Sequence, residues 1–131
     1  MILTLKIKMS DWWCQLEIED SSTFEDLHYA IQDAVEFDDD HLYEFYLASS
    51  RTSRNRITVS DYEDADEVRL KSAIPIQAGK KLFYLFDFGD HWVFQILPSR
   101  KTPFTPVKGS RYPRLLSEGG EKPEQYAEWD E

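Results

Sequence analysis

Cysteine and long apolar runs are both scarce in this chain, and each shortage excludes a class of protein. Cys14 is the one cysteine, so no disulfide can form within the chain and a zinc site with two cysteines is impossible. We therefore expect a reducing compartment and a cytoplasmic location. Apolar and polar residues alternate from the first residues onward, and no apolar run approaches the roughly 18 residues of a membrane span. The sequence predicts neither a signal peptide nor contact with a membrane.

Positive charge is missing from a long stretch, and this bears on the kind of partner. Residues 9–50 contain twelve acidic side chains and no Lys or Arg, and the whole chain has a formal net charge of −10. A surplus of that sign keeps a protein soluble and repels the phosphate backbone of nucleic acids. Cations gather after residue 98, where we single out as candidate binding residues Arg100, Lys101, Lys108, Arg111 and Arg114. We expect a protein partner, which the sequence does not identify, and do not favour a nucleic acid.

Apolar and aromatic residues, by contrast, are plentiful. Hydrophobic residues make up 41% and aromatic residues 15% of the 131 positions, which suffices for a buried core without disulfides or metals. We predict one domain over residues 1–131, in which residues 117–131 form an acidic tail that contains Tyr126 and Trp129.

Residues 82–97 are the centre of the predicted fold, because they have the pattern of two aromatic β-strands joined by a tight turn. Side chains alternate between the faces of a strand, so Trp92, Phe94 and Ile96 share one apolar face. That face should point into the core, and so apolar a hairpin should lie in the middle of a sheet. The turn contains Gly89, which allows a positive φ.

A helix of about three turns is predicted to begin near residue 22. Residues 22–25 (Ser-Thr-Phe-Glu) have the spacing of a capping box, in which a hydroxyl and a carboxylate bind backbone N–H groups of the first turn. Apolar residues then recur at three- and four-residue spacing, which gives the helix one stripe to place against a sheet. The residues that we expect in the structural core are Phe24, Leu27, Ile31, Phe45, Tyr84, Phe86, Gly89, Trp92, Phe94 and Ile96.

Other stretches alternate between apolar and polar residues and predict further strands. They are residues 3–9, 14–18 and 43–47, with residues 57–59 as a short edge strand. The expected fold class is α+β: a mixed or mostly antiparallel sheet of about five to six strands in ββαβ…ββ order, with one main amphipathic helix packed on one face.

Asp87, Asp90 and His91 lie at the central turn and allow two interpretations. Two carboxylates and an imidazole on one tight loop could ligate a metal ion, which would make this the site of a metal-dependent enzyme. The same residues are typical of a polar β-turn, because an Asp side chain can accept a hydrogen bond from a nearby backbone N–H. We favour the turn, and we expect no cofactor.

Motifs spread over nearly the whole chain carry a family resemblance. They are residues 23–28 (Thr-Phe-Glu-Asp-Leu-His) with Ile31 and Gln32, residues 41–45 (His-Leu-Tyr-Glu-Phe), residues 83–84 and 86–92 (Phe-Tyr and Phe-Asp-Phe-Gly-Asp-His-Trp), residues 111–114 (Arg-Tyr-Pro-Arg), and Pro123 with Glu124. In these the chain resembles the plasmid Ri-type open-reading-frame-three-like family, whose members are also described as insertion-element passengers or TnpR-like proteins. The run at residues 84–92 is the most specific part.

The resemblance implies an α+β domain with one helix on a mixed or antiparallel sheet, and it supplies no catalytic residues. The chain departs from the family pattern at two places. Trp13-Cys14-Gln15 stand where the pattern has Trp-Arg-Arg, and Lys122 and Gln125 stand where it has cysteines. A metal held by those cysteines in relatives is therefore not implied for this chain.

Three classes of function follow from these observations. We expect first a non-catalytic protein-interaction module, which offers a charged helix face, an acidic tail and a sheet edge to its partner. The alternative is an accessory factor of a mobile element, or another nucleic-acid-associated protein, that uses the basic stretch 100–114. The third is a metal-dependent enzyme at the central turn, although the sequence orders no nucleophile, acid and base into a catalytic set.

Overall fold

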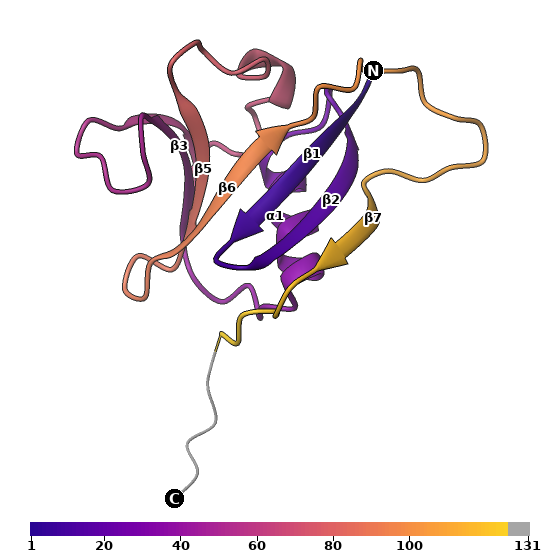
Figure 1. Ribbon diagram of the computed structural model, residues 1–131. Coiled ribbons are helices and arrows are strands. Elements are labelled where there is room, and N and C mark those ends of the chain that lie inside the picture. Colours follow the sequence, from indigo (N-terminus) through magenta and orange to yellow (C-terminus); the bar gives the residue numbers. More distant parts are fainter. Residues whose placement is uncertain (126–131) are drawn as a thin grey trace, which may run out of the picture.

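The computed structural model describes residues 1–125, which form one seven-stranded antiparallel sheet and one α-helix (Figure 1). The strands are β1 (Ile2–Met9), β2 (Trp12–Glu19), β3 (Tyr43–Ala48), β4 (Ile57–Asp61), β5 (Lys81–Phe86), β6 (Trp92–Pro98) and β7 (Arg114–Gly119). The helix α1 spans Phe24–Val35, and a 3-10 helix, η1, spans Leu70–Ser72. The strand order across the sheet is β4-β3-β5-β6-β1-β2-β7.

The expected fold class is wrong. The described residues contain seven strands in the order β1-β2-α1-β3-β4-η1-β5-β6-β7, and the helix contributes only 12 residues to a molecule that is mostly antiparallel sheet. The strand that the sequence did not reveal is β7. Its Leu115 pairs with Leu16 and its Ser117 with Gln15, so Leu116 is an extra residue that bulges out of the ladder. A bulge interrupts the period of two, which removes the alternation by which a strand is recognised.

The start of α1 also differs from the predicted capping box. Thr23 is the N-cap, and its hydroxyl accepts a hydrogen bond from the Asp26 N–H at 3.1 Å. The Asp26 carboxylate accepts in return from the Thr23 N–H at 3.0 Å. The box therefore uses Thr23 and Asp26 in place of Ser22 and Glu25, because the helix begins one residue later than expected, with Thr23 as its N-cap. The helix ends at Val35, and the C-cap Glu36 adopts a left-handed φ of 61°.

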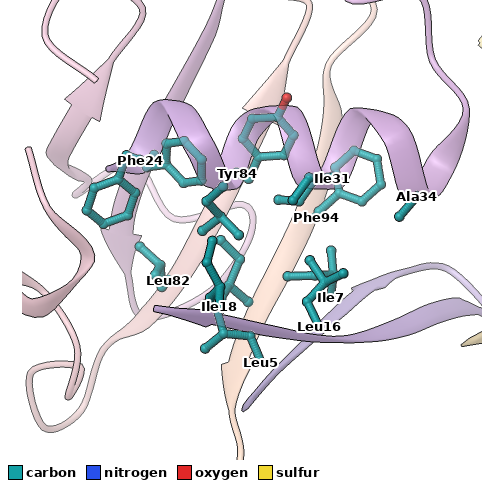
Figure 2. Packing of buried hydrophobic residues seen from close by; sticks show 14 of the residues in the cluster. Leu5, Ile7, Leu16, Ile18, Phe24, Ile31, Ala34, Leu82, Tyr84 and Phe94 are labelled. Carbon is teal, nitrogen blue, oxygen red and sulfur yellow. The ribbon is translucent and has the colours of Figure 1, made fainter. Parts of the chain in front are cut away.

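The core lies between α1 and one face of the sheet, which we call the core face. Figure 2 shows Ile31 and Ala34 of α1 above Ile7 and Leu16 of the sheet, and Phe94 belongs to the same cluster. Of the expected core residues, Trp92 is only half-buried and Gly89 is exposed in its turn. The others are fully buried: Phe24, Leu27, Ile31, Phe45, Tyr84, Phe86, Phe94 and Ile96.

The other face of the sheet, which we call the open face, has no helix of the described residues over it. A second, smaller apolar cluster lies at its centre and consists of Tyr46, Ala48, Phe83 and Leu85. The Arg56 guanidinium lies 4.4 Å from the centroid of the Tyr46 ring. The two faces therefore differ in kind: the core face is sealed by α1, and the open face combines a small apolar centre with polar surroundings.

Both edges of the sheet carry a β-bulge. At the β4 edge, Ser60 pairs with Phe45 and Thr58 with Tyr46, so Val59 is the extra residue. At the β7 edge, the extra residue is Leu116. Bulges twist an edge strand and disturb its free hydrogen-bonding groups, which discourages pairing with another strand.

The chain after β7 returns to the acidic loop that follows α1. The predicted acidic tail begins inside β7, and its Gln125 side chain accepts a hydrogen bond from the Asp38 N–H at 2.6 Å and donates one to Asp40 at 2.8 Å. Tyr126 and Trp129 lie outside the described residues. Within the described part, no helix has the length and apolar character needed to cross a membrane.

Candidate functional site

The structure divides the five candidate cations of the basic stretch. Residues 99–113 form a long loop that leaves the sheet beside the N-terminus and returns to it at β7 (Figure 1). Arg100 and Lys101 lie together at the start of the loop, on the rim of one groove. Lys108 and Arg111 are exposed farther along the loop. Arg114 begins β7, and its Nε lies 3.2 Å from Glu17 Oε1. These cations therefore do not form one continuous site.

The groove beside Arg100 and Lys101 is the candidate binding site, and we call it the proline groove. Its volume is about 620 Å³, which falls within the range of small-ligand and peptide pockets. Its apolar lining comes from three separate segments of the chain: Met1, Leu3, Ile74, Pro75, Pro98 and Pro103. Proline has no backbone N–H, so much of this lining presents carbon and carbonyl groups to a ligand.

The charges at the proline groove are positive and partly uncompensated. Asp20 lies on the rim, but its carboxylate binds the N-terminal ammonium at 3.3 Å. Neither Arg100 nor Lys101 forms an ion pair with any carboxylate of residues 1–125, and the Lys101 ammonium lies 4.7 Å from the Phe104 ring centroid. Two cations at the mouth of an apolar groove can bind an anionic group whose neighbouring parts are apolar.

Asp87, at the central turn, is engaged in holding that turn. Its Oδ1 accepts hydrogen bonds from the N–H groups of Gly89, at 3.0 Å, and Asp90, at 3.2 Å. Its Oδ2 lies 3.4 Å from His41 Nε2, and the His91 N–H donates to the Asp87 carbonyl at 2.7 Å. Asp90 and His91 are exposed on the outside of the turn. In the described part of the chain, no three His, Cys, Asp or Glu side chains converge as metal ligands would.

Sequence reasoning missed a ring of polar groups in which the buried His28, Gln32 and Tyr84 are joined to the exposed Asp39 of the loop after α1. The Asp39 N–H donates to Gln32 Oε1 at 3.0 Å, and Gln32 Nε2 donates to the Tyr84 hydroxyl at 3.0 Å. The Tyr84 hydroxyl lies 2.5 Å from His28 Nδ1, and His28 Nε2 lies 2.6 Å from Asp39 Oδ1. If the proton of His28 is on Nε2, each group donates to the next around a closed ring. Figure 2 shows the Tyr84 hydroxyl directed toward α1.

Burial sets the protonation states in this ring. Burial lowers the pKa of His28, and the Asp39 carboxylate only partly opposes this effect. Burial also raises the pKa of Tyr84 well above its usual value. A neutral His28 and a protonated Tyr84 are the forms that complete the ring. The signal that could have revealed it is the spacing of His28 and Gln32, which puts two polar residues one turn apart on the buried side of the helix.

An Asp-His-hydroxyl chain also occurs where a hydroxyl is activated as a nucleophile. Here the hydroxyl belongs to Tyr84, whose side chain has no exposed surface, and Tyr43 stacks on the His28 ring at 3.7 Å between centroids. Both ring nitrogens of His28 and the Tyr84 hydroxyl are engaged within the ring. The arrangement therefore fixes the acidic loop after α1 to the sheet, and we assign it a structural role.

Comparisons with known proteins return relatives of unknown function. The model of a family described as plasmid pRiA4b ORF-3-like protein matches residues 1–127. The uncharacterized protein y4hQ of Sinorhizobium fredii is 34% identical over 98 residues, which are 74% of this chain and 49% of y4hQ. The chain thus spans about half the length of that curated relative.

The fold also has a counterpart among solved structures. The crystal structure of a protein of unknown function, MM3350 from Methanosarcina mazei Go1, is similar to this chain with a TM-score of 0.61 and 25% sequence identity. The similarity covers 89% of this chain and 67% of the other.

Proposed function

The chain belongs to the plasmid pRiA4b ORF-3-like protein family, and we propose that it acts as a non-catalytic protein-interaction module. The family expected from the sequence motifs is thereby confirmed, whereas the relatives supply no activity. One observation carries the proposal: the proline groove combines an apolar lining with two cations that have no carboxylate partner among the described residues. In this proposal the module is a single domain that acts in the cytoplasm. The lone Cys14, which cannot form an internal disulfide, is the reason for choosing a reducing compartment.

The chemistry of the proline groove favours a peptide segment that carries one acidic side chain among apolar residues. Leu3 and Ile74 would contact the apolar side chains, and Arg100 and Lys101 would bind the carboxylate. The net charge of −10 repels acidic partners at long range, so a partner that is acidic only at this segment fits best. Affinity then comes mainly from burial of apolar side chains at the centre of the contact.

The groove is a better docking site than the edges of the sheet. A partner strand could add to β4 or β7 only beside a bulge, where the ladder of free backbone groups is irregular. The proline groove needs no backbone ladder, because side-chain contacts and two cations can hold the peptide. The sheet edge in our first expectation is therefore replaced by the groove.

The test uses short peptides in which one Glu is flanked by Leu, Ile and Pro, and it measures binding by fluorescence anisotropy. Some of these peptides should bind the wild-type chain, and replacing the Glu of such a peptide with Gln should lower its affinity. Changing Arg100→Glu together with Lys101→Glu should weaken binding tenfold or more, on the order of 1.5–3 kcal/mol for a charged contact. The matched control is Arg54→Glu, because Arg54 is exposed on the connector between β3 and β4, outside the groove.

Two results would count against this proposal. The first is that no peptide of the set binds the wild-type chain, and the second is that Arg54→Glu weakens binding as much as the double change. A separate measurement distinguishes the proposal from the nucleic-acid alternative. If Lys108→Ala, Arg111→Ala and Arg114→Ala abolish a salt-sensitive mobility shift with DNA or RNA, the basic stretch acts as a nucleic-acid surface.

A further inference from the structure

The strand register lines up one row of side chains across the open face. Trp13 lies opposite Lys8, Lys8 opposite Gln95, Gln95 opposite Phe83, and Phe83 opposite Tyr46. Directly opposed residues in an antiparallel sheet share a face and lie within contact distance. The centre of this row is hollowed, and the hollow, which we call the basic hollow, has a volume of about 460 Å³.

Three cations from separate parts of the chain border the basic hollow. Lys8 comes from β1, Arg51 from the connector between β3 and β4, and Lys81 from the start of β5. All three are exposed, and none forms an ion pair with a carboxylate of the described residues. By contrast, Arg56 and Arg114 are both paired with glutamates.

This grouping is unexpected in so acidic a chain. The sequence has 25 acidic and 15 basic side chains, yet the lining of the basic hollow contains no Asp or Glu. Like charges held close together repel each other, and an unpaired group of them is relieved when an anion binds among them. The three cations therefore point to an anionic ligand with several acceptor oxygens.

The floor of the basic hollow is uncharged and suits a different part of the same ligand. Val93, which is half-buried, contributes apolar surface above the buried Phe83, and the Gln95 side chain contributes an amide that can both donate and accept. A half-buried valine side chain can contact one face of a planar group. A planar group that carries polar atoms at its edge could also use the amide.

We propose that the basic hollow binds a small phosphate monoester with a planar organic group, of the type of a nucleoside monophosphate. Lys8, Arg51 and Lys81 bind the phosphate, because a dianion with three acceptor oxygens matches two ammonium groups and one guanidinium. Val93 contacts the planar group, and the Gln95 amide forms hydrogen bonds with polar atoms at its edge. The site is separate from the proline groove, so failure of either proposal in its test does not affect the other.

The test is calorimetric titration of the full chain with adenosine monophosphate, adenosine and inorganic phosphate at low salt. Adenosine monophosphate should bind, and adenosine or inorganic phosphate alone should bind at least about tenfold more weakly, because each lacks one half of the contacts. Arg51→Gln and Lys81→Gln should each weaken binding of the monophosphate about tenfold or more. Arg54→Gln is the matched control on the same connector, and it should leave the affinity unchanged.

A spectroscopic measurement locates the ligand. In ¹⁵N-labelled protein, adenosine monophosphate should shift the amide signals of Phe83 and Val93, and Arg51→Gln should reduce these shifts at equal ligand concentration. The proposal is overturned if the wild-type chain does not bind the monophosphate at millimolar concentration. It is also overturned if inorganic phosphate binds equally well, or if a single-stranded oligonucleotide binds more tightly and loses affinity in the same variants.

Discussion

The ring of hydrogen bonds through His28 shows how single residues hold the acidic loop after α1. Four carboxylates crowd this end of the helix, where the helix dipole disfavours negative charge: Glu36, Asp38, Asp39 and Asp40. Asp39 adopts a φ of 50° and turns its carboxylate toward His28 Nε2. One of the carboxylates is thus satisfied by a buried imidazole, which in turn is held by Tyr84.

This ring predicts that stability falls in weak acid. The folded-state pKa of His28 is lowered, so below the unfolded pKa of about 6.5 the unfolded chain binds a proton that the folded chain resists. The free energy of unfolding should therefore decrease as the pH falls from about 7 through 6.5 toward the lowered pKa, by up to about 1.4 kcal/mol per pH unit. Protonation would also remove the acceptor that Nδ1 offers to Tyr84. Urea denaturation at a series of pH values measures this.

The variant His28→Gln isolates the contribution of His28. The side chains around it, Asp39, Tyr43 and Tyr84, are present in both proteins, as are the other two histidines, His41 and His91. The variant should be less stable at pH 7.5 because the ring is broken, but its stability should change less between pH 7 and 5. An equal pH dependence in both proteins would show that His28 does not titrate in this window.

At the scale of elements, the two edge strands share a device that limits their pairing. β4 contains Val59 and β7 contains Leu116 as an extra residue in its ladder. Leu115 and Leu116 are exposed, so β7 would otherwise be an apolar edge strand of the kind that associates with other chains. The bulge offsets this risk, because it bends the strand and interrupts the row of free N–H and C=O groups.

Removing the bulge should therefore promote self-association. Deletion of Leu116 brings Leu115 and Ser117 into consecutive pairs with Leu16 and Gln15, which makes the β7 ladder regular. The deletion should leave the fold intact and produce dimers or larger species at concentrations where the wild-type chain has fewer, as measured by sedimentation velocity. Leu116→Ala keeps the bulge and is the matched control. Unchanged sedimentation of the deletion variant would mean that the bulge does not protect this edge.

At the scale of the whole molecule, the acidic segments meet on one side. The link between β4 and η1 pairs with the start of the helix, since the Phe24 N–H donates to the Val68 carbonyl and the Glu25 N–H to the Ala65 carbonyl. Acidic residues from both segments thus share one surface. The potential there raises the pKa of Tyr29, with Glu25 as the first cause and burial as the second. Repulsion among the charges of this surface lowers the free energy of unfolding.

We therefore expect salt to stabilise the protein. Raising sodium chloride from about 10 mM to about 300 mM shortens the screening length and should raise the melting temperature by a few degrees, about 1 kcal/mol. Differential scanning calorimetry measures the shift. Glu25 and Glu67 form no ion pair in the described part, so the double change Glu25→Gln and Glu67→Gln should reduce the rise in melting temperature that salt produces. A melting temperature that falls with salt would show that attractive ion pairs outweigh the repulsion.

Local chemistry was readable from the sequence where it involves neighbouring residues. The alternation at residues 3–9 and 14–18 falls within β1 and β2, which are joined by a tight turn. The cap of α1 uses a hydroxyl and a carboxylate three residues apart, although they are Thr23 and Asp26. The fold class was wrong because β7 lacks alternation, and the resulting strand order depends on pairings between distant segments.

The candidate sites depended still more on the tertiary structure. The basic stretch is continuous in sequence, but the loop separates its cations and leaves only Arg100 and Lys101 at the proline groove. Conversely, Lys8, Arg51 and Lys81 are far apart in sequence and meet at one hollow. A local sequence pattern cannot predict that these three residues are neighbours, because their proximity is set by the strand order and by the path of the connector after β3.

By itself, the sequence determined the family, the acidic charge and the apolar content, since each depends only on which residues are present and in what order. The tertiary structure alone decided which charged and polar groups became neighbours. The reason is physical: repulsion, hydrogen bonding and ligand binding act over a few ångströms in space, and an antiparallel sheet brings together residues that the chain keeps far apart.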